Sequence, residues 1–397
     1  MRALTFVSVS LFIACGGDDG DHPDAPIDAP VVTAQSYPLQ SIMGGIAYMV
    51  SVQVGGQTFA LDADTGSTTL GVAATACTSC AVTPKYTPGA TAMDMGTTSS
   101  STYGDGTSWS AENFSDTVEL VGEGSNVNMR FGSIQMQNGF FRGNIDQGII
   151  GFGDPIIALA GTDSFVTKRT AAGDKAEFAF QLCPTSGTMW FGGYDSSATA
   201  AGPQFSPMVA ISRTQPFYEV TISKATIGTT ALSLSGGAVV DTGTSVMIVP
   251  PAVETKLLSS ITSSAGYTAI FGAQQLTDQN CVDPGTHTNA EIDAMLPPFT
   301  ITLPGAAGNP PFTLSLPATQ SYLLAQQGAM CLGVIGASGV PVILGDTVLR
   351  PFITIFDVEN KQIGFAPQKG CALPPAPPRL GPPSLTPPPY FLPRLAR

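Results

Sequence analysis

The chain has 397 residues, 43% of them hydrophobic, which is long and apolar enough for two domains with cores of their own. Only 11% of the residues are charged, the formal net charge is −13 and the sequence pI is about 4.4. A surface this poor in Lys and Arg is not attracted to a phosphate backbone, so we expect no nucleic-acid partner. Carboxylates that bind protons at low pH relieve the self-repulsion, so the charge balance also suits an acidic medium.

Residues 1–15 have the pattern of an export signal. Arg2 precedes an apolar run, residues 3–14, that is too short for a permanent membrane-spanning helix. Residues 12–15 read Phe-Ile-Ala-Cys and are similar to a bacterial lipobox, in which the cysteine is lipidated and becomes the mature N-terminus. We therefore expect an exported protein of the bacterial cell envelope, whose one membrane contact is a lipid on Cys15. Plain secretion is the alternative.

Two segments are expected to lie outside any domain. Residues 16–36 are acidic, contain several Gly and Pro residues and have few large apolar side chains, so they are interpreted as a tether. Residues 372–397 are so rich in proline that they predict an extended, polyproline-like tail.

Residues 37–371 consist of short runs rich in Val, Ile, Thr and Phe, separated by Gly, Pro, Asn and Asp. Runs such as 47–56 and 352–367 predict an all-β body. The best helical signal begins at Pro250, where two prolines suit a helix start and Val253, Leu257 and Leu258 share one face. A second short helix is expected after Thr288, over residues 290–295.

An internal repeat organises this body. Asp-Thr-Gly occurs at Asp64 and again at Asp241, which is 177 positions later (241 minus 64), each time behind an apolar run. Each copy is followed by an apolar-apolar-Gly element, at residues 149–151 and 343–345. Since 177 positions is one domain length, we expect two related β lobes, residues 37–208 and 209–371, that bring one Asp-Thr-Gly loop each to a shared cleft.

These motifs, together with residues 103–107 (Tyr-Gly-Asp-Gly-Thr) and residues 343–367 near the end, make the chain resemble a pepsin-like aspartic endopeptidase. The matching motifs follow the family's order over residues 37–371. The resemblance implies an all-β, bilobal pepsin-like fold with the active-site cleft between the lobes and few short helices. It also implies a monomer that acts on a polypeptide substrate without a cofactor or a metal ion.

The chemistry explains why two carboxyl groups are needed. Peptide hydrolysis requires one group that takes a proton from water and another that gives one. Two carboxyl groups held close together cannot both ionise, so they share a proton and perform both tasks. The resemblance assigns these roles to Asp64 and Asp241, at acidic pH and on extended peptides with apolar side chains at the cut. It implies that the loops are supported by Thr65, Gly66, Ser67, Thr242, Gly243 and Thr244.

The resemblance also makes Tyr103, Gly104, Asp105 and Gly106 the tip of a flap that closes over the substrate. The family usually has a tryptophan shortly after the first catalytic loop as the partner of this tyrosine, but Gly71 stands in that place. The resting position of the flap is therefore left open. Asp105 is expected to accept a basic substrate side chain, which would permit Lys beside the cut. A solvated turn residue is the alternative for Asp105.

Seven cysteines are an odd number for an exported chain, and lipidation of Cys15 leaves six that can pair in an oxidising compartment. Zinc is disfavoured because the chain has only two histidines, His22 and His287, and one closely spaced cysteine pair. The resemblance implies the disulfides Cys77–Cys80, Cys281–Cys331 and, as the remaining pair, Cys183–Cys371.

Two other functions are weighed against the protease. A non-catalytic pepsin-fold protein of the cell envelope would bind peptides or inhibitors; such relatives commonly lose an active-site Asp or Gly, and this chain keeps both. A serine hydrolase is disfavoured because the sequence has no Gly-x-Ser-x-Gly elbow and His22 lies in the tether.

Overall fold

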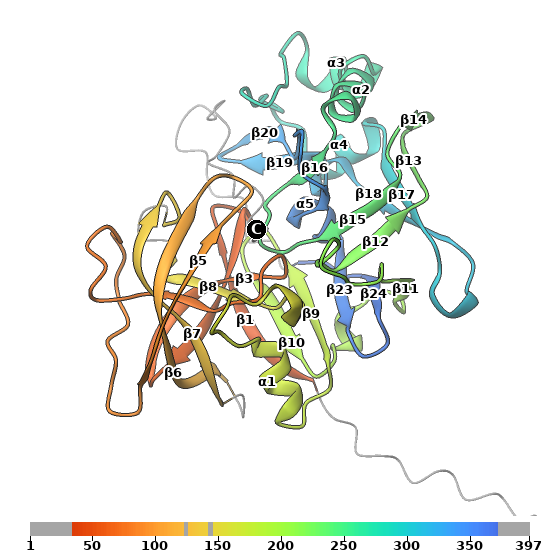
Figure 1. The fold of residues 1–397 in the computed structure, drawn as a ribbon. Helices are drawn as coiled ribbons and strands as arrows, with labels where there is room; N and C mark the ends of the chain where they lie inside the picture. The colour runs from red at the N-terminus through yellow and green to blue at the C-terminus, as the bar shows by residue number, and fades with distance from the viewer. Residues whose placement is uncertain (1–33, 123–125, 142–145, 372–397) are drawn as a thin grey trace, which may run out of the picture. The chain divides into compact units, whose positions relative to one another are not determined.

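The computed structural model describes residues 34–122, 126–141 and 146–371 (Figure 1). The expected signal segment, the lipidation at Cys15, most of the tether and the proline-rich tail lie outside these residues. Strand β1 begins at Gln35, so the last two residues of the expected tether already belong to the fold.

The first half of the described chain is mostly β-structure. Its strands alternate buried and less buried positions, as in β6, where Trp109, Ala111 and Asn113 are buried in every second position. The elements are β1 Gln35–Ile42, β2 Ala47–Val54, β3 Gln57–Asp64, β4 Gly71–Ala73, β5 Met93–Thr102, β6 Ser108–Leu120, β7 Val127–Asn138, β8 Gly148–Gly151, η1 Pro155–Ile157, α1 Phe165–Ala171, β9 Glu177–Leu182, β10 Gly187–Phe191, η2 Ser196–Ala198 and β11 Gln204–Pro207.

The second half repeats this character and adds most of the helices. Its elements are β12 Glu219–Ile222, β13 Lys224–Ile227, β14 Thr230–Leu232, β15 Gly236–Val240, β16 Met247–Val249, α2 Pro251–Thr262, α3 Ala265–Phe271, α4 Asn289–Met295, β17 Phe299–Leu303, η3 Ala306–Gly308, β18 Phe312–Leu316, η4 Ala318–Gln320, β19 Leu323–Gln326, β20 Ala329–Leu332, β21 Val334–Gly336, β22 Val342–Leu344, α5 Asp346–Leu349, β23 Phe352–Asp357 and β24 Gln362–Pro367.

The two halves share one strand topology. In the first, the neighbours run β3-β8-β4-β7, and in the second they run β15-β22-β16-β21. The strand that leads to each aspartate pairs in parallel with the apolar strand of its own half, β3 with β8 and β15 with β22. The fold is therefore the bilobal, mostly β architecture that the repeat indicates. Strands β23 and β24 join β9 and β11 in a 13-stranded sheet, so both halves contribute to one sheet.

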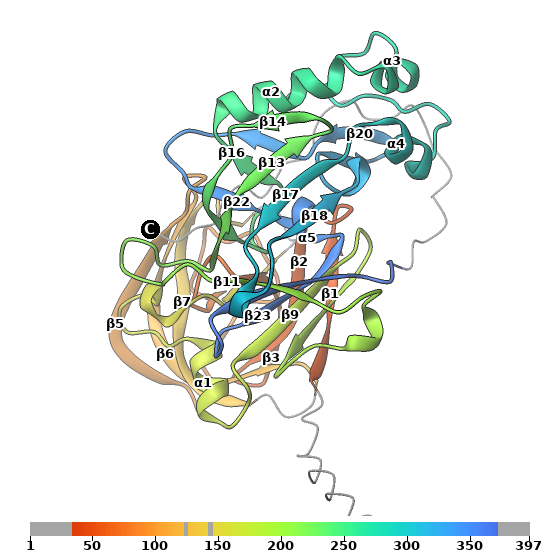
Figure 2. The ribbon, with the colours of Figure 1, turned by 90° about the vertical axis from the view of Figure 1, so that its right-hand side faces the viewer.

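The expected helices are present. Helix α2 begins with Pro251 at its first position and buries Val253, Leu257 and Ile261, four residues apart, while Leu258 is only half-buried. Helix α4 begins with a capping box between Thr288 and Glu291. Helices α2, α3 and α4 lie close together beside the strands of the second half (Figure 2).

Three disulfides cross-link the described residues. They are Cys77–Cys80, Cys281–Cys331 and Cys183–Cys371, the pairs that the resemblance implied. The last joins Cys183, which directly follows β9, to the end of the described chain across 188 sequence positions. Such bonds persist in an oxidising compartment.

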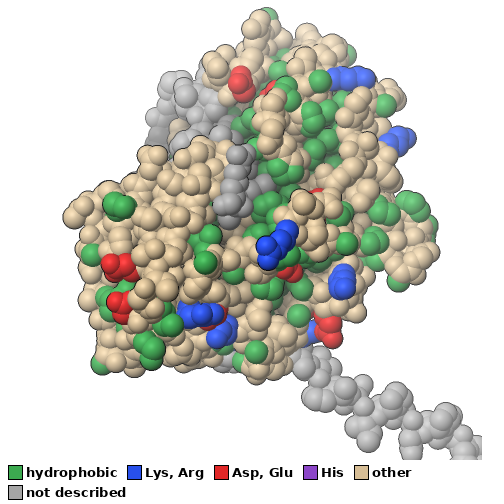
Figure 3. All heavy atoms as spheres, viewed as in Figure 1, with side chains coloured by type: hydrophobic (Ala, Val, Ile, Leu, Met, Phe, Trp, Pro, Cys, Tyr) green, Lys and Arg blue, Asp and Glu red, His purple; other side chains and the backbone are tan. Residues whose placement is uncertain are grey.

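Charged side chains are sparse on the face shown in Figure 3, which agrees with their low share of the sequence. Within the described ranges, no helix has the length and apolar character needed to cross a membrane.

Candidate active site

The two Asp-Thr-Gly aspartates meet at the ends of equivalent strands. Asp64 is the last residue of β3 and Asp241 directly follows β15. A side-chain hydrogen bond joins their carboxyl groups. Both residues are fully buried. Two carboxyl groups within hydrogen-bonding contact require at least one proton between them.

Each carboxyl group is held by its own loop in the same way. One oxygen accepts the N–H of the glycine two residues on, and the other accepts a hydroxyl three residues on. The bonds are Gly66 N to Asp64 Oδ1 at 2.7 Å, Ser67 Oγ to Asp64 Oδ2 at 2.5 Å, Gly243 N to Asp241 Oδ1 at 2.9 Å and Thr244 Oγ1 to Asp241 Oδ2 at 2.5 Å. The loop residues named from the sequence therefore surround the pair.

The glycines also explain how the loops come so close. A Cβ at Gly66 would lie 2.8 Å from Asp241 Oδ1, and a Cβ at Gly243 would overlap Asp64 Oδ1. Each glycine therefore lies against the aspartate of the opposite half. Any larger residue would separate the two carboxyl groups.

Two buried threonines tie the loops together. The Thr65 hydroxyl donates to Val240 O at 3.0 Å and accepts the Thr242 N–H at 3.0 Å. The Thr242 hydroxyl donates to Ala63 O at 2.6 Å and accepts the Thr65 N–H at 3.2 Å. The four bonds form a reciprocal pattern between segments 177 positions apart, which sets the spacing of the two aspartates.

The electrostatics of the pair favour retention of a proton. Burial raises the pKa of Asp64 well above its ordinary value, and the negative charges of Asp241 and Asp62 raise it further. Burial also raises the pKa of Asp241, while the Thr244 hydroxyl and the neighbouring backbone N–H groups oppose this rise. As a pair, the two groups hold one shared proton to a higher pH than an ordinary carboxyl group does.

Two further buried carboxyl groups lie near the pair and were not predicted from the sequence. Asp62 is on β3 and Asp346 begins α5, and both are fully buried. Burial raises the pKa of Asp346 well above its ordinary value; Arg350 lowers it, and the charges of the nearby aspartates raise it. The sequence did contain a signal for Asp346: this residue directly follows the apolar-apolar-Gly element, whose strand β22 pairs with the strand that leads to Asp241.

The predicted flap residues form the turn between β5 and β6. The Tyr103 N–H donates to Thr107 O at 2.9 Å and the Gly106 N–H donates to Tyr103 O at 3.0 Å. Asp105 Oδ1 accepts the N–H and the hydroxyl of Thr107 at 2.9 and 2.7 Å, so this carboxylate stabilises the turn. Tyr103 is buried in an apolar cluster with Phe140 and with Ile149 of β8.

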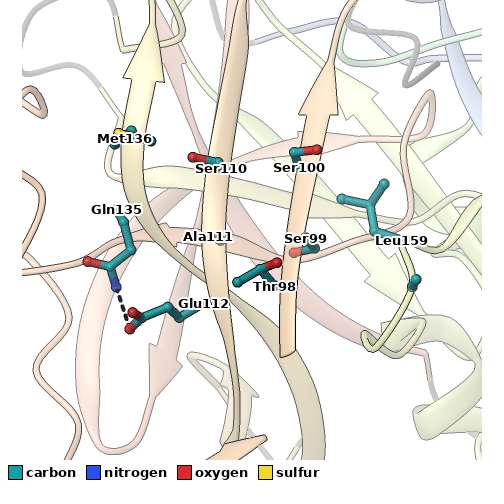
Figure 4. A pocket seen from close by; sticks show the side chains of 10 residues that line it. Thr98, Ser99, Ser100, Ser110, Ala111, Glu112, Gln135, Met136 and Leu159 are labelled. Carbon is teal, nitrogen blue, oxygen red and sulfur yellow. Dashed lines mark hydrogen bonds between the residues drawn. The ribbon is translucent and has the colours of Figure 1, made fainter. Parts of the chain in front are cut away.

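A separate hollow of about 620 Å³ lies against β5, β6 and β7 (Figure 4). Its polar lining includes Glu112, which accepts a hydrogen bond from Gln135 at 3.2 Å. It is lined by neither Asp64 nor Asp241, so it is distinct from the candidate site. Among the described residues, no group of three or more His, Cys, Asp or Glu side chains is arranged to hold a metal ion.

Comparison with known proteins is consistent with this geometry. A family model described as eukaryotic aspartyl protease matches residues 47–368. An aspartic protease from Phaffia rhodozyma is 27% identical over 323 residues, which cover 79% of this chain and 75% of that protein. Syncephapepsin from Syncephalastrum racemosum is 29% identical over 84% of this chain and 80% of its own length. Pepsin-2B from Gadus morhua is 28% identical over 80% of this chain and 94% of its own length.

Proposed function

The chain belongs to the eukaryotic aspartyl protease family, and from this premise we propose that it is an endopeptidase in which Asp64 and Asp241 activate one water molecule. Residues 37–208 and 209–371 are the two lobes that contribute one aspartate each. The observation that carries the proposal is the hydrogen bond between the two carboxyl groups, held in place by matching loops.

The shared proton gives the pair both a base and an acid. The ionised carboxylate takes a proton from water while the water oxygen bonds to the peptide carbonyl carbon, and the protonated partner gives its proton to the carbonyl oxygen. When the C–N bond breaks, the first carboxyl group returns its proton to the amine nitrogen. The partner recovers a proton from the tetrahedral intermediate, which restores the resting pair. No cofactor or metal ion takes part.

The substrate is an extended polypeptide that pairs strand-fashion beside the β5–β6 hairpin. Tyr103 is packed in an apolar cluster with Phe140, Phe141 and Ile149, and this apolar setting of the flap supports a preference for apolar side chains at the cut. Tyr103 to Gly106 are the flap that closes over the substrate. One oxygen of Asp105 accepts two hydrogen bonds in the turn, and the presence of this carboxyl group at the flap tip supports acceptance of Lys beside the scissile bond.

We propose that the enzyme is exported from the cell. Three disulfides are consistent with an oxidising compartment, and residues 1–15 have the pattern of an export signal. We also propose attachment to a bacterial envelope through a lipid on Cys15, which the lipobox-like segment at residues 12–15 supports. The enzyme acts as a monomer without a nucleic-acid partner. A Cys15→Ser variant tests the anchor, because it should move from the membrane fraction to the soluble fraction.

The function is tested by cleavage of denatured globin between pH 2 and 8, with and without pepstatin. Wild type should cleave at acidic pH, and pepstatin should inhibit it. Asp241→Asn keeps the shape of the side chain but removes the shared proton chemistry, so cleavage should fall by several orders of magnitude. Undiminished cleavage by Asp241→Asn would contradict the mechanism. Absence of cleavage by wild type at every pH would favour a non-catalytic peptide-binding protein.

A further inference from the structure

A tryptophan of the flap hairpin fills a slot between two glycines. Trp109 is near the start of β6 and only 3% exposed. Strands β4 and β7 run in parallel with Gly71 opposite Gly132. A Cβ at Gly71 would lie 3.3 Å from Trp109 Cζ2, and a Cβ at Gly132 would lie 3.2 Å from Trp109 Cζ3. The indole ring therefore occupies space that side chains at these two positions would need.

The same indole holds the flap tyrosine. Trp109 Nε1 donates a hydrogen bond to Tyr103 Oη at 2.8 Å. Phe140 contacts both rings, stacked on Tyr103 at a centroid distance of 5.5 Å and edge-on to Trp109 at 6.5 Å. Tyr103 is 2% exposed, so its hydroxyl needs a partner within the protein. The orientation of the tyrosine is therefore set by a donor six residues away on the same hairpin.

We propose that Trp109 is the positioning residue of the flap tyrosine, and that Gly71 and Gly132 are small because its indole fills the slot between them. The inference rests on the proposed function, since it assigns a residue that prepares Tyr103 for substrate. Positions 71 and 109 border the same slot, so a tryptophan at either position could place an indole there. The slot has room for a single ring, because a side chain at Gly71 and the indole of Trp109 would compete for the same volume.

The hydrogen bond from Trp109 fixes the orientation of the Tyr103 ring before the substrate binds. Without this bond, the ring must be ordered during binding, and the entropy lost at that step weakens binding more than it slows the chemical step. Trp109→Phe keeps an aromatic ring in the slot but removes the N–H. A neutral hydrogen bond of ordinary strength corresponds to about a three- to tenfold change, so KM should rise by that factor while kcat changes less.

A double-mutant cycle with Tyr103→Phe separates positioning from packing. If Trp109 acts through the Tyr103 hydroxyl, Trp109→Phe should raise KM in the wild-type background and have little further effect in the Tyr103→Phe background. Equal effects in both backgrounds would overturn the proposal and leave Trp109 with a packing role only. Asp241→Asn is measured in parallel. If this variant retains activity, the proposed function fails. If wild type is active and Asp241→Asn is not, but the effects of Trp109→Phe and Tyr103→Phe on KM are additive, only the Trp109 inference is contradicted.

A third experiment places the tryptophan at position 71 instead of position 109 and tests directly whether the slot takes one indole. Gly71→Trp alone should lower stability and activity, because two rings would then compete for the slot. Trp109→Ser alone should empty the slot and raise KM. The double variant Gly71→Trp/Trp109→Ser should recover KM toward the wild-type value, and a double variant no better than the worse single variant would refute exchange between the two positions. Circular dichroism establishes that each variant is folded.

Fluorescence gives a readout that does not depend on turnover. The chain has two tryptophans, so Trp190→Phe leaves Trp109 as the single emitter. Trp190 is on β10, outside the cluster that contains Trp109. In this background, Tyr103→Phe should shift the emission of Trp109 because its N–H loses its acceptor. An unchanged spectrum would show that the indole does not sense Tyr103 and would contradict the proposal.

Discussion

The threonine pair that ties the two aspartate loops together offers a quantitative test. Thr242→Val removes one hydroxyl and leaves the volume of the side chain almost unchanged. Two buried backbone groups then lose their partners, the Ala63 carbonyl at 2.6 Å and the Thr65 N–H at 3.2 Å. Each unsatisfied buried group costs about 1–3 kcal/mol, so the free energy of unfolding should fall by about 2–6 kcal/mol.

The assay is urea unfolding followed by far-ultraviolet circular dichroism, with cleavage of a peptide substrate measured on the same samples. The matched control is Thr313→Val, since the Thr313 hydroxyl also shares a hydrogen bond, with Thr302 at 3.0 Å, but is exposed. That change should alter the unfolding free energy by no more than about 0.5 kcal/mol. If Thr242→Val costs no more than Thr313→Val, or keeps full kcat, the threonines do not hold the aspartates in place.

The other predictions concern pH and the covalent framework. Thr244→Ala removes the hydroxyl that lowers the pKa of Asp241, so that pKa should rise and the acid limb of the kcat/KM profile should move to higher pH; an unmoved limb would show that the bond has no effect on ionisation. Asp346→Asn should leave stability unchanged near pH 3 and raise it at pH 7. The folded protein holds the Asp346 proton more tightly than the unfolded chain, so wild type loses stability as the pH rises from the ordinary Asp range through the raised pKa. Equal urea midpoints for wild type and variant at both pH values would contradict this. Replacing Cys183 and Cys371 with Ser should cost about 5 kcal/mol, because the bond closes a loop of 188 positions, and a loss below about 1 kcal/mol in the same assay would contradict the entropic estimate.

The sequence predicts much of this site because its chemistry is local. Asp-Thr-Gly places the carboxyl group, the glycine N–H and the following hydroxyl within four residues, so the bonds at Asp64 and Asp241 follow from the motif itself. The repeat also indicates two related lobes, and the structure shows the same strand order in both. Helices α2 and α4 were predicted because each has a proline or a capping residue at its start.

What the sequence did not predict depends on contacts between distant segments. Trp109 follows the ordinary alternation of a strand, and its role emerges only when Gly71 and Gly132 come into register. Asp346 belongs to a motif that the sequence shows, but its raised pKa depends on burial beside a pair that two other segments form. Helix α3 was missed because it has seven residues and contains Gly266, so propensity and periodicity are both weak.

The central claim is that Asp64 and Asp241 share one proton. Neutron diffraction from crystals of the deuterated enzyme at about pH 5 would locate that proton directly. We expect a single deuterium between the two carboxyl groups, with deuterons from Ser67 and Thr244 directed at the outer oxygens. Two deuterons on the pair, or none, would contradict the account, because the pair would then lack either the base or the acid that hydrolysis requires.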